Sequence, residues 1–187
     1  MRIISGNIKG KKILDPKDMN TRPLKDLTKE SIFNILAHSN KLSVRLENSN
    51  VLDLFAGVGS FGLECLSRGS SNVTFVENYN NVLPVLKKNI SNLDFEENSL
   101  IIENNIIDNL NFQNFKKKFD IIFIDPPYKE KNVFTILNNI IIAKILDNDG
   151  IIILHRHKKE KDKFPDNFRV IEEKTYGISR VFFGSDL

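Results

Sequence analysis

The fold is decided by residues 53–62, Asp53-Leu54-Phe55-Ala56-Gly57-Val58-Gly59-Ser60-Phe61-Gly62, which join an apolar run to a run with helical periodicity. Glycines allow a tight turn and let the backbone come close to a ligand, and free amides at the start of a helix favour a polar or anionic group. A strand before such a loop and a helix after it indicate a nucleotide-type binding loop. Gly57, Gly59 and Gly62 also spell GxGxxG, so a dinucleotide cofactor is a second possibility.

Short apolar runs alternate with amphipathic stretches on both sides of this loop. That alternation is typical of an α/β fold, in which helices cover both faces of a mostly parallel sheet. The expected buried strands are 51–55, 72–76, 100–103, 120–124 and 150–154. The expected helices are 23–38, 60–68, 80–93 and 133–146, with a short one near 112–117. Two more strand-like runs, 168–173 and 178–183, predict a hairpin that completes seven strands.

The composition restricts the class of protein. With 187 residues, of which 41% are hydrophobic and 27% charged, the chain fits a globular domain and not a disordered one. Its longest apolar runs are too short to span a bilayer, and its start lacks the apolar region of a secretory signal. Cys65 is the single cysteine, so no internal disulfide can form. We expect a cytoplasmic protein without membrane association.

The N-terminal segment is basic. Residues 1–40 are expected to form an extension, a ribbon with turns at Gly6 and Gly10 followed by a helix, and residues 41–187 the main domain. The first 30 residues hold eight cations, Lys29 among them, against four anions, while the whole chain has a net charge of +3. A second basic run covers 156–163. Such ends suit a polyanion, although on charge alone solvated surface is the commoner explanation.

The histidines near the second basic run are the remaining candidates for metal ligands. His155 and His157 share one face of a strand, but Arg156 and the nearby lysines repel a cation, and no third ligand is evident. We expect no metal site and interpret both histidines as part of a basic surface.

An acid follows the second strand. Glu77 lies twenty positions after Gly57, where a carboxylate can accept both ribose hydroxyls of an adenosine-containing cofactor. Nicotinamide enzymes and S-adenosylmethionine enzymes both use such an acid, so Glu77 alone does not distinguish them.

The end of the fourth strand favours one of these two classes. Asp125-Pro126-Pro127-Tyr128 follows an apolar run, and two prolines fix the backbone as it leaves the strand. The Asp125 carboxylate and the Pro126 carbonyl can accept hydrogen bonds from an exocyclic NH2 group, while Tyr128 stacks on the attached base. This arrangement suits a planar amine, which a nicotinamide enzyme does not need.

Taken together, these motifs resemble the Rossmann-like class I S-adenosylmethionine-dependent methyltransferases that modify amino groups of nucleic acids. The likeness extends over nearly the whole chain to the RsmD family of bacterial 16S ribosomal RNA guanine-N2 methyltransferases. It is carried by Arg2-Ile3-Ile4-Ser5-Gly6, Lys9-Gly10, Lys12, Arg22-Pro23, Glu30, Phe33, Asn34, Leu52-Asp53-Leu54-Phe55-Ala56-Gly57 and Gly62-Leu63-Glu64-Cys65-Leu66-Ser67-Arg68-Gly69.

The resemblance implies a cytoplasmic enzyme that methylates one guanine of 16S rRNA in an assembled or partly assembled small ribosomal subunit. It implies catalytic roles at the guanine for Asp125, Pro126, Pro127 and Tyr128. For S-adenosylmethionine it implies contacts from Asp53, Phe55, Gly57, Gly59, Glu77, Asn105 and Asp125, with Glu77 at the ribose and Asn105 near the adenine. The candidate RNA contacts are Arg2, Lys9, Lys11, Lys12 and Arg22.

Two other functions use some of these features. A DNA adenine-N6 or cytosine-N4 amino methyltransferase has the same kind of amine pocket, but such enzymes usually add a target-recognition domain, and residues 155–187 leave little room for one. A noncatalytic RNA-binding module explains the basic ends and leaves the glycine loop, Glu77 and the amine pocket unexplained.

Overall fold

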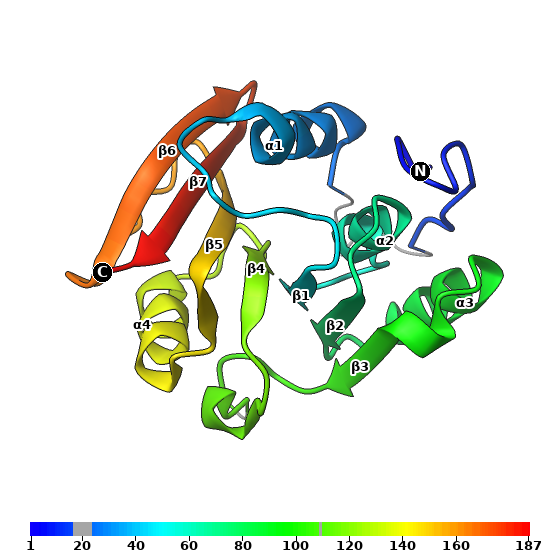
Figure 1. The fold of residues 1–187 in the computed structure, drawn as a ribbon. Coiled ribbons are helices and arrows are strands. Elements are labelled where there is room, and N and C mark those ends of the chain that lie inside the picture. Colours follow the sequence, from blue (N-terminus) through cyan, green and yellow to red (C-terminus); the bar gives the residue numbers. More distant parts are fainter. Residues whose placement is uncertain (17–23, 109) are drawn as a thin grey trace.

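The computed structural model describes residues 1–16, 24–108 and 110–187 (Figure 1). The elements in chain order are α1 (Asp26–His38), β1 (Asn50–Leu54), α2 (Ser60–Ser67), β2 (Asn72–Glu77), α3 (Leu83–Asn92), the 3-10 turn η1 (Glu96–Asn98), β3 (Ser99–Glu103), the 3-10 turn η2 (Phe112–Asn114), β4 (Phe119–Ile124), α4 (Val133–Ala143), β5 (Leu146–His157), β6 (Phe168–Tyr176) and β7 (Ser179–Asp186). Within these ranges, every helix is too short or too polar to cross a membrane.

The seven strands form one sheet in the order β3-β2-β1-β4-β5-β7-β6. The pairs among β1 to β5 are parallel, and β7 runs antiparallel between β5 and β6. The expected mostly parallel, seven-stranded sheet of the Rossmann-like class is therefore confirmed.

Alternate residues of the central strands point to two separate cores. In β1, Val51 belongs to the cluster that includes Phe61 of α2, whereas Leu52 belongs to the cluster that includes Leu137 of α4. Because successive side chains of a strand point to opposite faces, a strand covered on both sides must be apolar at every position. Figure 1 shows α1 and α2 on one side of the sheet and α4 on the other.

Some expected boundaries were wrong. The helix expected over 133–146 ends at Ala143, because Lys144 takes a left-handed conformation (φ 52°) whose amide bonds back to the Ile141 carbonyl at 3.0 Å. Strand β5 then begins at Leu146 rather than at 150, and a register shift against β4 accommodates the extra residues. Helix α3 begins at Leu83, with a proline in its first turn.

The N-terminal segment is less regular than the expected ribbon. The one bridge in residues 1–16 pairs Arg2 with Lys12, next to a hydrogen bond of 2.9 Å from the Ile3 amide to the Lys11 carbonyl. Its turn packs closely on α2: a Cβ on Gly6 (φ 88°) would lie 1.9 Å from the Ser67 carbonyl oxygen. Pro23, expected to introduce α1, lies outside the described residues.

A buried charge pair joins α1, α2 and the N-terminal segment. The Lys29 ammonium lies 3.6 Å from Glu64 Oε2, and both side chains are fully buried. Lys29 also donates to the Arg2 carbonyl (3.0 Å) and the Ser60 hydroxyl (3.2 Å). Burial lowers the pKa of Lys29 despite the neighbouring carboxylate. Lys29 is thus a structural residue of the core and not part of the basic surface.

The Glu64 carboxylate also holds the backbone of the N-terminal segment. It accepts hydrogen bonds from the amides of Ile4 (2.8 Å) and Ser5 (2.9 Å) and from Arg68 Nε (2.8 Å). Every donor around it would lose a charged acceptor if this side chain became neutral.

We predict that Glu64→Gln lowers the free energy of unfolding by about 3–5 kcal/mol, the cost of leaving one charge of a buried pair without its partner. Urea unfolding of the full chain measures the change. The matched control is Glu103→Gln, because Glu103 pairs with Lys87 where both side chains are half exposed. That control should cost less than about 1 kcal/mol. Equal effects of the two substitutions would contradict a structural role for the buried pair.

Candidate active site

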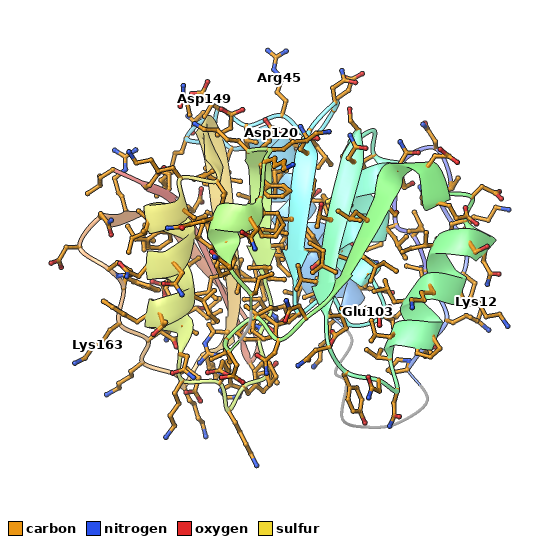
Figure 2. All side chains as sticks on the ribbon, turned by 90° about the horizontal axis from the view of Figure 1, so that it is seen from below. Lys12, Arg45, Glu103, Asp120, Asp149 and Lys163 are labelled. Atoms are coloured by element: carbon orange, nitrogen blue, oxygen red, sulfur yellow. The ribbon has the colours of Figure 1, made fainter. Side chains whose placement is uncertain are left out.

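The site lies where the strand order reverses. Strand β1 has β2 on one side and β4 on the other. The sheet therefore grows from β1 first toward β2 and β3, and then in the opposite direction toward β4 and β5. Ligands of open α/β sheets bind at this point, outside the carboxyl ends of the strands. Figure 2 shows the two edges of the sheet: Glu103 at the end of β3 lies away from Asp120, Asp149 and Arg45, which mark the amino edge.

The glycine loop leaves β1 at the carboxyl edge with an unusual backbone. Phe55, Gly57 and Gly59 have φ values of 62°, 57° and 85°. The left-handed region is unfavourable for a side chain such as that of Phe55, and backbone strain of this kind is concentrated at functional sites. A Cβ on Gly59 would lie 2.7 Å from Leu86 Cδ1, so a larger residue there would displace the Leu86 side chain besides straining the backbone.

Glu77 supports this loop from β2. Its Oε2 accepts the Gly57 amide at 2.7 Å, and its Oε1 accepts the amides of Asn78 and Tyr79, each at 2.9 Å. A carboxylate has about four lone-pair positions, so three backbone bonds leave about one for a ligand hydroxyl. Glu77 therefore shapes the loop, and its expected contact with a ribose stays a prediction.

Asp53 lies beneath the loop and is almost completely buried, with 1% of its surface exposed. Its Oδ2 accepts the Gly62 amide at 3.0 Å. Burial raises the pKa of Asp53 well above its usual range, and the negative charges of Asp125 and Glu77 raise it further. Carboxyl groups from two neighbouring strands thus act on Asp53, and a positively charged ligand would relieve this repulsion.

The Asp125-Pro126-Pro127-Tyr128 segment leaves β4 beside the glycine loop. The Asp125 amide donates to the Leu54 carbonyl at 3.3 Å, which joins the ends of β4 and β1. Pro126 is buried, Pro127 is exposed, and the side chains of Asp125 and Tyr128 are partly exposed. The structure thus brings together the glycine loop and the segment expected to hold an amine.

Two residues of β5 were misinterpreted from the sequence. His155 is 5% exposed, and its Nδ1 lies 2.8 Å from Asp125 Oδ1. It is therefore not part of a basic surface. The register explains the contact: Ile124 pairs with Leu154, so the next residues, Asp125 just after β4 and His155 within β5, lie side by side. The sequence did contain a signal for this contact that was not used. The expected fourth and fifth strands end at 124 and 154, so Asp125 and His155 are the next residue of each.

Arg156 is also buried, with 1% of its surface exposed. Its guanidinium donates to the carbonyls of Pro127 (3.4 Å) and Glu130 (2.8 Å) and to Asp162 Oδ2 (2.9 Å). The expected basic run over 156–163 therefore begins with a cation that is neutralised inside the fold. Arg156 instead ties the segment after β4 to the connector after β5.

Asn105 lies in the turn that follows β3. Its Oδ1 accepts the amides of Ile107 (2.9 Å) and Asp108 (3.2 Å), and its Nδ2 donates to the Asp108 carboxylate (2.9 Å). Its side chain thus stabilises a local turn at the carboxyl edge. Contact between Asn105 and an adenine stays a prediction.

The expected RNA-contacting residues belong to the N-terminal segment, which packs against α2. Arg2, Lys9, Lys11 and Lys12 are all exposed. Lys29 donates both to the Arg2 carbonyl and to Ser60 at the start of α2. The Asn7 amide donates to the Ser67 carbonyl at the end of α2, at 2.7 Å. Figure 2 shows Lys12 on the side of the molecule that carries α3. Arg22 lies outside the described residues.

Other parts of the described surface carry weaker candidates. Two hollows, of about 550 and 370 Å³, lie at the amino edge, lined by residues such as Asp147 and Asn148 in one and Asn50 and Asn98 in the other. Neither contains a residue of the glycine loop or of the segment after β4. Over the ranges that the structure covers, no three His, Cys, Asp or Glu side chains are grouped to hold a metal ion.

Comparisons with known proteins agree with this geometry. Ribosomal RNA small subunit methyltransferase D of Buchnera aphidicola is 35% identical over 172 residues, covering 92% of this chain and 86% of that protein. The protein of the same name from Haemophilus influenzae is 32% identical, covering 95% of this chain and 90% of its own length. A solved structure of the Escherichia coli protein yhhF, a methyltransferase by name, superposes with a TM-score of 0.81 at 26% identity, covering 100% of this chain and 97% of that one.

The family model described as conserved hypothetical protein 95 matches residues 1–185. This match covers nearly the whole chain, including the glycine loop and the segment after β4, and several relatives are more than 30% identical. The chain belongs to this family, the RsmD family of methyltransferases.

Proposed function

We propose that this protein transfers a methyl group from S-adenosylmethionine to the exocyclic N2 amine of one guanine in 16S rRNA, acting in the cytoplasm on an assembled or partly assembled small ribosomal subunit. The observation that carries the proposal is the position of Asp125-Pro126-Pro127-Tyr128 beside the glycine loop at the reversal of strand order. The relatives named ribosomal RNA small subunit methyltransferase D support ribosomal RNA as the substrate.

The residues present suit a cationic cofactor. S-adenosylmethionine supplies a methyl group on a positively charged sulfonium, which is electrophilic toward an amine. The negative charges of Asp125 and Glu77 near Asp53 favour such a cation, and the loop from 55 to 59, which is left-handed at Phe55, Gly57 and Gly59, lies at the same edge. In this proposal Asp53 and the loop bind the methionine part, Glu77 the ribose, and the turn at Asn105 the adenine.

The segment after β4 serves the other reactant. The lone pair of guanine N2 is delocalised into the ring, so the amine is a poor nucleophile until it is held in position. Asp125 and the Pro126 carbonyl accept its hydrogen bonds and favour the positive charge that develops on nitrogen. Tyr128 provides an aromatic face for a base that has left its stack. The nitrogen can lose its proton late, so Asp125 need not be a strong base.

The N-terminal segment provides the RNA contacts in this proposal. Residues 1–40 act as an RNA-binding extension, whose exposed Arg2, Lys9, Lys11 and Lys12 hold phosphates. The extension and the methyltransferase domain share a core, because Ile3, Ile13 and Phe33 belong to the same cluster as Val51. RNA held by the extension is therefore held by the catalytic domain itself.

The direct test supplies methyl-labelled S-adenosylmethionine, unmodified small subunits and, separately, DNA. We expect label on one guanine N2 of 16S rRNA, located by mass spectrometry, and none on DNA. Asp125→Asn should reduce turnover far more than cofactor affinity, because the amide presents an NH2 group where the amine needs an acceptor, whereas most of the cofactor contacts come from other residues. Label on DNA in place of RNA would refute the proposed substrate, and near-normal turnover of the variant would remove Asp125 from the chemistry.

The raised pKa of Asp53 predicts that cofactor binding releases a proton. A bound cation favours the carboxylate form, so binding lowers this pKa and affinity rises with pH until Asp53 is ionised in the free protein. Calorimetry in two buffers with different ionisation enthalpies measures the release. Asp53→Asn should abolish it, whereas Asp149→Asn, an exposed acid at the amino edge, should not. Equal binding enthalpies of the unmodified protein in the two buffers would refute this coupling.

A salt titration tests the proposed RNA contacts. Replacing Arg2, Lys9, Lys11 and Lys12 by Ala should reduce the log-log slope of subunit binding by up to roughly 3 units, at about 0.7–0.9 per phosphate contact. The matched control removes four exposed cations at the amino edge, Lys116, Lys117, Lys118 and Lys144. Both variants change the net charge equally, so similar slopes would assign the effect to overall charge. Cofactor affinity should be unaffected in either variant.

A further inference from the structure

The contact between His155 and Asp125 connects β5 to the proposed amine-binding segment. His155 Nδ1 lies 2.8 Å from Asp125 Oδ1, and His155 Nε2 is buried without a hydrogen-bond partner among the residues that the structure describes. The two side chains are 6% and 19% exposed, so water competes little for this bond. Asp125 thus has one oxygen engaged by a side chain from the neighbouring strand.

The surroundings of His155 indicate where its proton lies. An ionised carboxylate can only accept hydrogen bonds, so Nδ1 must donate. Placing a second proton on Nε2 would bury an N–H group without an acceptor and add a charge, both of which are costly. The geometry therefore favours the neutral ring with its proton on Nδ1. In that form the ring orients Asp125 without neutralising its charge.

The backbone on both sides limits the movement of the ring. His155 pairs with Val181 of β7, so its strand is held on the side away from β4. Its ring lies 6.4 Å from the ring of Tyr128, at 71°. A donor fixed in this way holds Oδ1 of Asp125 and leaves Oδ2 for another partner.

We propose that His155 is a positioning residue for methyl transfer, which fixes the rotamer of Asp125 so that the free carboxylate oxygen faces the target amine. This inference rests on the proposed function. No proton moves through His155: its Nδ1 proton stays in the bond to Asp125 throughout the reaction. Arg156 donates to the main-chain carbonyl of Pro127. Strand β5 therefore contacts the amine-binding segment both at the Asp125 side chain, through His155, and at the main chain, through Arg156.

Two polar variants separate the donor from the ring. The amide nitrogen of Asn is bonded to Cγ, as Nδ1 is in His, whereas the longer Gln places its amide near the position of Nε2. His155→Gln should slow single-turnover methyl transfer by about 10²-fold, as expected for a misplacement of about 1 Å, with affinities for cofactor and subunits unchanged. His155→Asn should keep most of the rate. His38→Asn and His38→Gln, at an exposed histidine, are the matched controls.

The results distinguish this inference from the proposed function. Similar rates for the Asn and Gln variants, whether near normal or equally slow, would overturn the positioning role, because donor placement would then not matter. Absence of methyl transfer by the unmodified protein would overturn the proposed function itself. Ring nitrogen NMR of the free protein gives a result that does not depend on activity. We expect His155 to carry its proton on Nδ1, and Asp125→Ala to change that tautomer; a proton on Nε2 would refute the donor assignment.

Discussion

The site depends on the parallel pairing of β1 with β4 and of β4 with β5. The pairs Leu54 with Ile124 and Ile124 with Leu154 are the last of these parallel ladders and lie at one level, although β5 continues to His157 against β7. The glycine loop, Asp125 and His155 follow these pairs. They come from distant parts of the sequence, and the strand register brings them together. Since a shift of one residue in register would turn each side chain to the opposite face, the apolar cores on both faces fix the site as firmly as they fix the fold.

The carboxyl edge of the sheet also carries an unfavourable electrostatic energy. Asp53 is buried near Asp125 and Glu77, and the raised pKa of Asp53 expresses the repulsion and the lost hydration. Backbone amides offset part of it: Gly62 donates to Asp53, and Gly57, Asn78 and Tyr79 donate to Glu77. The remaining unfavourable energy is a property of the free protein that a cationic ligand relieves. The carboxyl groups that destabilise the free protein at this edge therefore favour the binding of a positively charged ligand.

Most of the fold and the two turns that form the candidate site could be predicted because their signals are local. Strands buried on both faces are apolar throughout, and a glycine loop or a pair of prolines marks its own turn. The functions of Lys29, His155 and Arg156 could not be read in this way, because each charged or polar side chain is buried by residues far away in the sequence. A run such as His155-Arg156-His157 looks like solvated surface until β7 and the connector up to Asp162 cover it. The start of β5 was missed for a related reason: three polar residues, 147–149, interrupt the apolar pattern at an exposed strand end.

The buried pair of Lys29 and Glu64 gives the N-terminal segment a mechanical connection to the cofactor loop. Helix α2 begins at Ser60, directly after that loop, and the Ser60 hydroxyl accepts a hydrogen bond from Lys29. Lys29 binds the Arg2 carbonyl, and Glu64, one turn further along α2, binds the amides of Ile4 and Ser5. Together with three bonds between Ser67 and Ser5, Asn7 and Ile8, five hydrogen bonds join this segment directly to α2. Phosphates bound at Arg2 would therefore be positioned relative to the start of α2, and hence relative to the reacting groups, by a rigid core and not by a linker.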